Sequence, residues 1–347
     1  MPQSRVTIPQ LAAELGLSVG TVSSALNNKP SVAEATRRRV HEAAARLGYL
    51  HNRSAAALRS GRTGILSLHL PANTADLQFY MNFAFGLSSV VAREGYDVLL
   101  DHEHSHANPL TLVDAAIVVD WSSDLRTPDQ LAKAGIPIFA VDGIPSPDAP
   151  ATRVISTNYA ALTAEIAERA IAAGARKAAL LSSSSLPGVA WQRDVHATLE
   201  AACTNHGIPL THVDLAVGTP ANEVAAAIKS LIDREQPDFL VSTGERWAGI
   251  ANLYLQLGEP DSSVPWLVST AGDPITELSS PHITAFDLMP YEYGRHCGDF
   301  VVAFLDDEPA AADRNEAVWE AHINWARHWS QPYGGGPATD ATRISRT

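Results

Sequence analysis

Histidine is the residue whose spacing in this chain first suggests chemistry. His102, His104 and His106 alternate in the segment DHEHSHANP, so an extended backbone would place all three imidazoles on one side. Three imidazoles at one point can bind Zn²⁺. The alternative is a polar loop without a metal, and we adopt that interpretation: we expect no metal and no cofactor.

Other patterns that support catalysis or disulfide bonding are missing from the sequence. It contains no glycine-rich phosphate loop, no G-x-S-x-G elbow and no paired zinc cysteines. Cys203 and Cys297 lie far apart, which fits a reducing cytoplasm. No window reaches the roughly 18 apolar residues of a membrane span, and MPQSRVTIPQ does not read as a secretory signal. We therefore expect a cytoplasmic protein that is not an enzyme.

Positive charge is concentrated at the N-terminus of a chain that is acidic as a whole. Residues 1–62 contain nine Lys or Arg and three Glu, a surplus of six, while the 347-residue chain has a formal net charge of −13. The other 285 residues therefore carry −19. A basic head on an acidic body is typical of a polyanion-binding module joined to a domain that avoids polyanions.

The basic head has the periodicity of three short helices. Thr7 and Gln10 have the spacing of a capping box for the first helix, and Gly16 is placed to end it. Ser18 can cap a second helix, and a third is expected from about 33 to 47 with Arg37, Arg38 and Arg39 outward. Two helices joined by a glycine-containing turn indicate a helix-turn-helix, although an ordinary helical hairpin has the same pattern.

The second helix lies in GLSVGTVSSALN, a stretch without any charge. In a recognition helix that enters the major groove of DNA, bulk and negative charge are penalised where the helix meets base edges. Its Ser and Thr hydroxyls can bond to bases or phosphates, and the helix N-terminus itself attracts phosphate. The absence of charged residues from this stretch therefore favours DNA recognition.

The segment from Val6 to Gly64 resembles the DNA-binding head and hinge of the lactose-repressor (LacI/GalR) family. The motifs that carry the resemblance are VT-I, GLSVGTVS, LN, TRRRV, A-LGY, NR and A-LRSGRT. The resemblance implies base reading by Val19, Gly20 and Ser24. It implies further DNA contacts from Thr7, Ser18, Thr21, Ser23, Asn27, Thr36, Asn52, Arg53 and Ala55, and a hinge helix over 52–60 whose Leu58 is an apolar wedge in the minor groove.

Two positions of the head depart from the family pattern. Ala33 stands where relatives have a capping Ser, and Ser31, three residues before Glu34, is an alternative cap. Ala56 replaces the hinge Arg or Gln. Since Val19, Gly20 and Ser24 offer one side-chain donor among them, base readout is expected to depend on van der Waals contact, water and the hinge.

After residue 64, short apolar runs alternate with helical segments. The runs are GILSLHL, YDVLLD, AAIVVDW, IPIFAVD, KAALLSS, HVDLAVG, DFLVST and PWLVST, and the helices are expected at 76–94, 159–173, 189–206, 221–234 and 246–257. This alternation predicts two sets of doubly wound parallel α/β layers, whose ligands bind at the carboxyl ends of the strands. The histidine-containing segment replaces a helix between YDVLLD and AAIVVDW.

The body is similar to the effector domain of the same family, a pair of lobes of the periplasmic-binding-protein type. The similarity implies an effector site made of Phe79, Tyr80, Asp142, Trp191, Arg193, Glu245 and Asp273, with Arg193 clamping the effector. Four positions depart from the usual sugar-binding set: Thr157, His196, Gly244 and Met289. A purely structural role, such as helix capping by Asp142, remains the alternative for each site residue.

We therefore predict a homodimeric transcription regulator, a repressor, that binds pseudo-palindromic operator DNA and responds to a small effector such as a sugar or related metabolite. The alternatives are a regulator of this family without an effector, a solute-binding protein, and an enzyme. The predicted divisions are 1–50 (helix-turn-helix), 51–63 (hinge), 64–330 (effector binding and dimerisation) and 331–347 (disordered tail). Within the body, the N-lobe covers about 64–156 and 287–320, and the C-lobe about 157–286 and 321–330.

Overall fold

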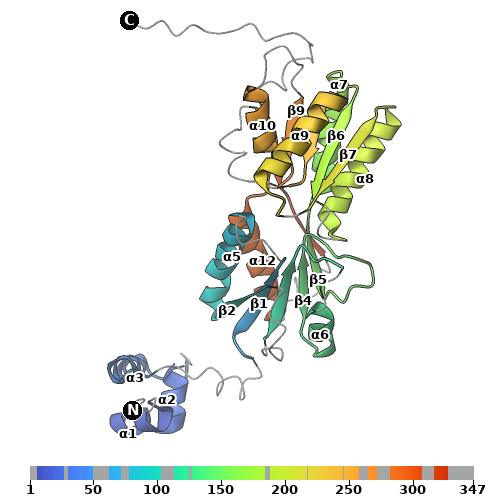
Figure 1. Ribbon diagram of the computed structural model, residues 1–347. Coiled ribbons are helices and arrows are strands. Elements are labelled where there is room, and N and C mark those ends of the chain that lie inside the picture. Colours follow the sequence, from blue (N-terminus) through green and yellow to red (C-terminus); the bar gives the residue numbers. More distant parts are fainter. Residues whose placement is uncertain are drawn as a thin grey trace, which may run out of the picture. The chain divides into compact units, whose positions relative to one another are not determined.

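The structure is a computed structural model that divides into two compact units, Met1–Thr63 and Gly64–Thr347 (Figure 1). Among the residues that it describes, no helix is both long and apolar enough to cross a membrane. The described residues are 6–26, 30–49, 62–71, 78–102, 113–123, 125, 127–183, 188–216, 218–244, 246–257, 265–271, 282–306 and 316–326.

The first unit contains the helices α1 (Ile8–Leu15), α2 (Val19–Leu26) and α3 (Glu34–Leu47). The predicted caps of the first two helices are confirmed. Gln10 Oε1 accepts a hydrogen bond from Thr7 N at 2.8 Å, Gly16 ends α1 at φ 65°, and Thr21 N donates to Ser18 Oγ at 3.0 Å. A small apolar core joins the three helices: Leu11, Ala12, Val22, Ala25, Val32, Val40, Ala43 and Ala44.

Two expectations for α3 are wrong. The helix begins after Ala33, which provides no side-chain cap, so Ser31 does not replace the missing serine. Arg37 does not project into solvent: its Nη1 binds Glu34 at 2.5 Å and its Nη2 donates to the carbonyl of Val32 at 3.1 Å. The guanidinium therefore holds the start of α3 against the preceding turn.

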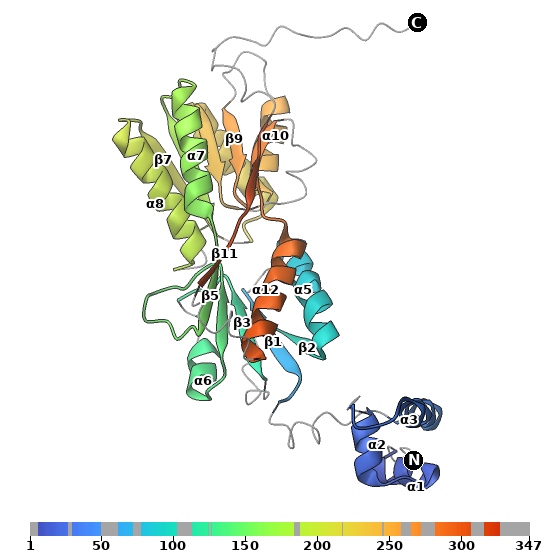
Figure 2. The same cartoon turned by 180° about the vertical axis from the view of Figure 1, so that it is seen from behind.

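The second unit contains two six-stranded sheets, each with one helical layer on either face (Figure 2). The first sheet has the order β11-β5-β4-β3-β1-β2 and is entirely parallel. Its strands are β1 (Ile65–Leu70), β2 (Asp97–His102), β3 (Ala115–Val119), β4 (Ile138–Val141), β5 (Arg153–Thr157) and β11 (Glu316–Trp319).

The second sheet has the order β12-β10-β9-β8-β6-β7, and only its β12–β10 pair is antiparallel. Its strands are β6 (Ala178–Ser183), β7 (Leu210–Leu215), β8 (Phe239–Ser242), β9 (Trp266–Ser269), β10 (Ile283–Asp287) and β12 (His322–Asn324). The two doubly wound α/β lobes predicted from the alternation are confirmed. We call the lobe built on the first sheet the N-lobe and the other the C-lobe.

The helices cover the sheets with the apolar faces that their sequences provide. In the N-lobe, α5 (Gln78–Val91) and α12 (Pro290–Leu305) pack on one face, and α6 (Thr127–Lys133) packs on the other. In the C-lobe, α7 (Tyr159–Ala172) and α8 (Ala190–Asn205) lie opposite α9 (Ala221–Glu235) and α10 (Trp247–Leu257). A 3₁₀ turn, η1 (Ala92–Glu94), follows α5.

The chain crosses between the lobes three times, after β5, after β10 and between β11 and β12. Two of the crossings are bonded to each other. Asn158 Nδ2 donates to Glu320 Oε2 at 3.0 Å, and Ala321 N donates to Asn158 Oδ1 at 3.1 Å. Because parallel strands all end at the same edge, the carboxyl ends of β3 and β4 face the region where the lobes meet.

Candidate functional site

The N-terminal end of α2 is an exposed surface of the first unit. Ser18, Val19 and Gly20 are exposed, and Val19 retains half of its accessible surface although it is apolar. The Ser18 and Thr21 hydroxyls lie 2.8 Å apart and Ser18 caps the helix, so this end of α2 is fixed. A Cβ on Gly20 would meet only Ser18 Oγ, at 3.8 Å, so the surface is open there.

Each acidic residue of the first unit is paired with an arginine, in the pairs Glu34–Arg37 at 2.5 Å, Glu42–Arg38 at 3.8 Å and Glu14–Arg46 at 3.1 Å. The α2 helix contains no acid. The acids are therefore neutralised within the unit, which leaves a surface that does not repel a polyanion.

Other positions predicted to contact DNA are distributed over the unit. Thr7 is exposed, and Ser23, Ser24 and Thr36 are half-buried. The remaining predicted contacts lie outside the described residues: Asn27, Asn52, Arg53, Ala55 and Leu58.

In the second unit, two buried carboxyl groups stand at the ends of adjacent strands. Asp120 follows β3 and is 6% exposed, and Asp142 follows β4 and is 3% exposed. Both have left-handed backbone, with φ of 49° and 61°. Asp is one of the few residues with a side chain that adopts this conformation readily. The strand ends thus turn both carboxyl groups into the interlobe region.

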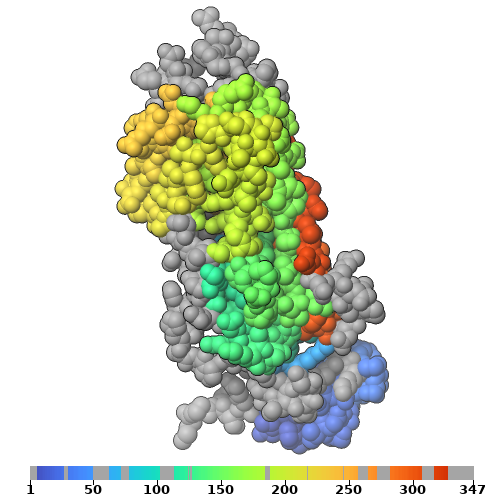
Figure 3. Space-filling view, turned by 90° about the vertical axis from the view of Figure 1, so that its right-hand side faces the viewer, coloured from blue at the N-terminus to red at the C-terminus, as the bar shows by residue number. Residues whose placement is uncertain are grey.

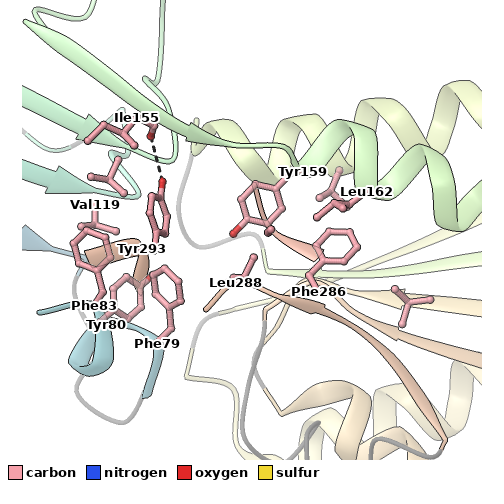
Figure 4. Packing of buried hydrophobic residues seen from close by; sticks show 14 of the residues in the cluster. Phe79, Tyr80, Phe83, Val119, Ile155, Tyr159, Leu162, Phe286, Leu288 and Tyr293 are labelled. Carbon is pink, nitrogen blue, oxygen red and sulfur yellow. Dashed lines mark hydrogen bonds between the residues drawn. The ribbon is translucent and has the colours of Figure 1, made fainter. Parts of the chain in front are cut away.

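Neutral donors surround the two acids. Thr157 Oγ1 and Tyr293 OH donate to Asp142 Oδ1 at 2.8 Å and 3.0 Å. Figure 4 shows the further bond of Tyr293 OH to the carbonyl of Ile155. The Tyr80 hydroxyl donates to Asp120 Oδ2, and the Trp191 side chain from the C-lobe also hydrogen-bonds to Asp120.

Burial makes these carboxyl groups difficult to ionise. Desolvation raises the pKa of Asp120 to about 6, and the hydrogen bonds from Tyr80 and Trp191 limit the rise. Desolvation, together with the nearby charge of Asp120, raises the pKa of Asp142 to about 8. Like charges in a low dielectric cannot ionise independently, so the pair titrates as a unit near neutral pH.

Aromatic rings enclose the acids from both lobes. Phe79 and Tyr80 of α5 are buried and pack edge to face at 5.3 Å. Tyr159 at the start of α7 stacks on Trp191 of α8 at 5.1 Å, and its hydroxyl points toward the N-lobe residues (Figure 4). We call Asp120, Asp142, Tyr80, Tyr159, Trp191 and Tyr293 the interlobe cluster.

The structure therefore brings Phe79, Tyr80, Asp142 and Trp191 together, as the sequence predicted, and adds Asp120, Tyr159 and Tyr293, which the sequence analysis missed. A signal for Asp120 was present, because it follows the buried run AAIVV just as Asp142 follows IPIFAV. The side chain of His102 and the residues His104, His106, Glu245 and Asp273 lie outside the described residues. Elsewhere in the described chain, no group of three or more His, Cys, Asp or Glu is arranged to hold a metal.

Arg193 lies at the rim of the lobe contact. Its Nη1 donates to the carbonyls of Pro145 and Gly188, both at 2.8 Å, and its Nη2 to that of Ile144 at 3.2 Å. A Cβ on Gly143 would stand 2.5 Å from Ala190 Cβ, so the lobes touch closely there. Figure 3 shows these green and yellow-green segments meeting on the visible face.

The positions that depart from the family pattern have structural explanations. Thr157 belongs to the Asp142 network. Gly244 leaves space for Trp247, whose indole would lie 2.1 Å from a Cβ at that position. His196 packs edge to face on His212 at 4.7 Å, and Met289 starts the crossing into α12 with φ 44°.

A helix-turn-helix unit followed by two periplasmic-binding-protein-like lobes defines a class of bacterial transcription regulator. Residues 7–52 match the model of bacterial regulatory proteins of the lacI family, and residues 167–321 match a periplasmic binding protein-like domain. The chain belongs to the lacI family.

Two curated relatives illustrate this membership. The chain is 32% identical to the HTH-type transcriptional regulator RafR of Escherichia coli over 192 residues, which is 52% of this chain and 56% of RafR. It is 36% identical over 100 residues to the maltose regulon regulatory protein MalI of Vibrio furnissii, covering 29% of this chain and 72% of that protein. The match to RafR thus spans about half the length of that relative.

Solved structures share the fold at low sequence identity. A lac repressor dimer bound to operator and the anti-inducer ONPF aligns with a TM-score of 0.73 at 17% identity, covering 92% of this chain and 98% of that one. A complex of the transcriptional regulator CelR with cellobiose aligns with a TM-score of 0.61 at 21% identity, with the same coverage.

Proposed function

We propose that this protein is a sequence-specific DNA-binding transcription regulator, a repressor, that catalyses no reaction. It acts in the cytoplasm as a homodimer on a pseudo-palindromic operator and responds to a small-molecule effector, a sugar or related metabolite. The observation that carries the proposal is the capped, acid-free and exposed N-terminal end of α2. Such an end fits the major groove, where Val19 can contact a thymine methyl.

A homodimer is supported by exposed apolar side chains on one part of the N-lobe. Met81 and Phe85 lie one turn apart on α5 and are 37% and 61% exposed, and Leu100, which pairs with Leu68 on the α5 face of the sheet, is 52% exposed on edge strand β2. An apolar cluster of this kind indicates a protein interface. We assign a second copy of this chain to it, because two heads are required to read a pseudo-palindrome.

Effector control follows from the interlobe cluster. Residues from both lobes meet at Asp120 and Asp142, so a ligand at this site contacts the two lobes at once. If the ligand binds one lobe arrangement better, it shifts the population toward that arrangement, and DNA affinity changes through linkage. We propose Phe79, Tyr80, Asp142, Trp191, Arg193, Glu245 and Asp273, with Asp120 added, as the effector-contacting set.

The DNA-binding proposal can be tested by selecting duplexes from a random library with purified protein and measuring affinity for the selected sequence. Gly20→Glu places a carboxylate at the end of α2, where the backbone has room for a Cβ. An acid in the first turn favours the helix, so the head stays folded. Like-charge repulsion from DNA should nevertheless weaken binding by about a hundredfold or more.

Ala13→Glu is the matched control, because Ala13 is exposed on α1 and has no assigned DNA contact. Equal losses in the two variants, or no selected sequence for the wild type, would refute recognition by α2. Titration of the selected duplex with sugars then tests effector control. If no ligand changes the affinity, the effector-independent alternative holds.

A further inference from the structure

The interlobe cluster contains a hydrogen-bond acceptor that nothing in the described chain satisfies. Asp142 Oδ1 accepts two hydrogen bonds, whereas Asp120 Oδ1 is buried and has no partner among the described residues. The Asp120 carboxyl faces the other lobe, because Trp191 of that lobe bonds to it. A buried acceptor without a donor destabilises the folded chain, so this oxygen indicates a place for a ligand's donor.

Among the described residues, no positively charged group hydrogen-bonds to either acid of the cluster. The groups in the described part of the chain that do hydrogen-bond to them are neutral hydroxyls and an indole. The Arg193 guanidinium lies at the lobe contact, and three backbone carbonyls already hold it. Two buried carboxylates without a counter-ion are expensive, because each raises the cost of ionising the other.

The surrounding aromatic rings favour a cation. Tyr80 and Tyr159 come from opposite lobes, and Trp191 stacks on Tyr159 at an interplanar angle of 25°. The faces of such rings carry negative electrostatic potential and attract ammonium groups, most strongly where water is excluded.

We propose that the effector of this protein is an organic ammonium compound, such as an amino sugar or an amino alcohol, whose positive N–H donors bind Asp120 and Asp142 between the lobes. This inference rests on the proposed function, because it takes the interlobe cluster as the effector site. A neutral sugar would supply a donor to Asp120 Oδ1 but no charge. An ammonium ligand supplies the donor, the counter-charge and the partner for the rings.

The proposal predicts a distinctive pH dependence. As the pH rises from about 5 to about 8 the two acids ionise, so affinity for an ammonium ligand rises while affinity for a neutral ligand does not. The other titratable groups facing the acids are Tyr80, Tyr159, Tyr293 and Cys297. Burial raises the pKa of each of them, so they stay neutral over this range.

Matched pairs of probes that differ in charge provide the test. The unfolding midpoint of the full chain is measured with millimolar 5-aminopentan-1-ol or pentane-1,5-diol, and with D-glucosamine or D-glucose, since a ligand of the folded state raises the midpoint. The amine of 5-aminopentan-1-ol stays protonated from about pH 5 to about pH 8, like a lysine. Calorimetric titration at both pH values then gives its affinity.

The variant is Asp120→Asn, because Asn also tolerates the left-handed backbone of this position. Its matched control is Asp148→Asn, at an exposed aspartate. We expect at least one ammonium probe to raise the midpoint more than its neutral partner, to bind more tightly at the higher pH, and to lose about tenfold or more in affinity in Asp120→Asn alone.

Neutral probes that stabilise the protein as strongly as their ammonium partners would overturn the inference, and so would ammonium probes without effect. If D-glucose alone raises the midpoint and changes DNA affinity, the ammonium inference fails while the proposed function stands. If the protein selects no DNA sequence, the proposed function itself fails.

Discussion

Asp142→Asn replaces the one of the two buried carboxyl groups whose pKa is raised more, and so tests its contribution to stability. Asn has nearly the same shape, tolerates the φ of 61° at this position, and keeps an oxygen that can accept from Thr157 and Tyr293. The substitution therefore removes an ionisable group without opening a cavity. Any change in the pH dependence of stability can then be assigned to the loss of this carboxyl group and of its coupling to Asp120.

The direction of this pH dependence follows from the raised pKa of Asp142. Asp142 has a pKa of about 8 in the folded protein, against 3.8 as its ordinary value. Its contribution to stability is complete below about pH 4 and is lost as the pH rises to about 8, at up to about 1.4 kcal/mol per pH unit. Between about pH 5 and about pH 8 the wild type should lose up to about 4 kcal/mol that Asp142→Asn retains.

Urea unfolding followed by tryptophan fluorescence measures this difference. All seven tryptophans lie at or after Trp121, so the signal reports the second unit and not the head. The free energy of unfolding is obtained at both pH values for the wild type, for Asp142→Asn and for the exposed control Asp148→Asn. Asp148→Asn should follow the wild type. The free energy of unfolding of Asp142→Asn should change least between the two pH values, and at the higher pH it should be the largest of the three.

Histidines and surface acids contribute the same pH dependence of the free energy of unfolding in all three proteins, so their contribution cancels when the proteins are compared. If the wild type and Asp142→Asn lose the same free energy between the two pH values, Asp142 does not take up a proton on folding. The burial argument for the interlobe cluster would then be wrong.

Four further predictions concern DNA binding, dimerisation and the lobe contact. Operator affinity should fall steeply with salt through counterion release, and a flat plot of log affinity against log salt would contradict DNA binding. Leu58→Ala should weaken specific binding and abolish DNA bending while leaving non-specific binding nearly unchanged, which a gel bending assay with operator titrations checks. Phe85→Asp should dissociate the dimer in sedimentation, because it places a charge in the apolar cluster, whereas the exposed substitution Asp148→Asn should not. Arg193→Ala should leave DNA affinity intact but remove the effector's influence on it; an unchanged effector response would place the effector site elsewhere.

The sequence predicted the regular elements well because they depend on local chemistry. The caps at Ser18 and Gly16, and the helices α7 to α10, follow from capping residues and hydrophobic period. The strands β5 (RVIST), β10 (ITAFD), β11 (EAVW) and β12 (HIN) were missed because each is short and partly polar. They are recognisable as strands once the sheet supplies their partners.

The interlobe cluster was predicted only in part, for a different reason. The backbone conformation of the residue after a strand sets the direction of its side chain. At Asp120 and Asp142 this conformation is left-handed, and no pattern in the sequence marks it. The Arg193 bonds to carbonyls join residues 48 and 49 positions apart, a relation that no local pattern encodes. Departures such as Thr157 and Gly244 became interpretable only with their partners, Asp142 and Trp247, in place.

The helix α5 connects the proposed effector site with the proposed dimer surface. Its first turn carries Phe79 and Tyr80 in the interlobe region together with the exposed Met81, and the exposed Phe85 follows one turn later. It packs closely on α12, because a Cβ on Gly86 would meet the Tyr291 carbonyl oxygen at 2.0 Å. The two backbones are in contact there, so a shift at Tyr80 would be expected to move both helices together.

Such rigid coupling is what allosteric control requires. A ligand that replaces the Trp191 bond to Asp120 changes the position of Tyr80, which donates to the same carboxyl group. If α5 and α12 move as one body, the displacement would reach the apolar face of α5 without being absorbed by loops. In a dimer assembled through that face, the separation of the two subunits, and with it the spacing of the two heads on DNA, would then depend on what occupies the interlobe cluster.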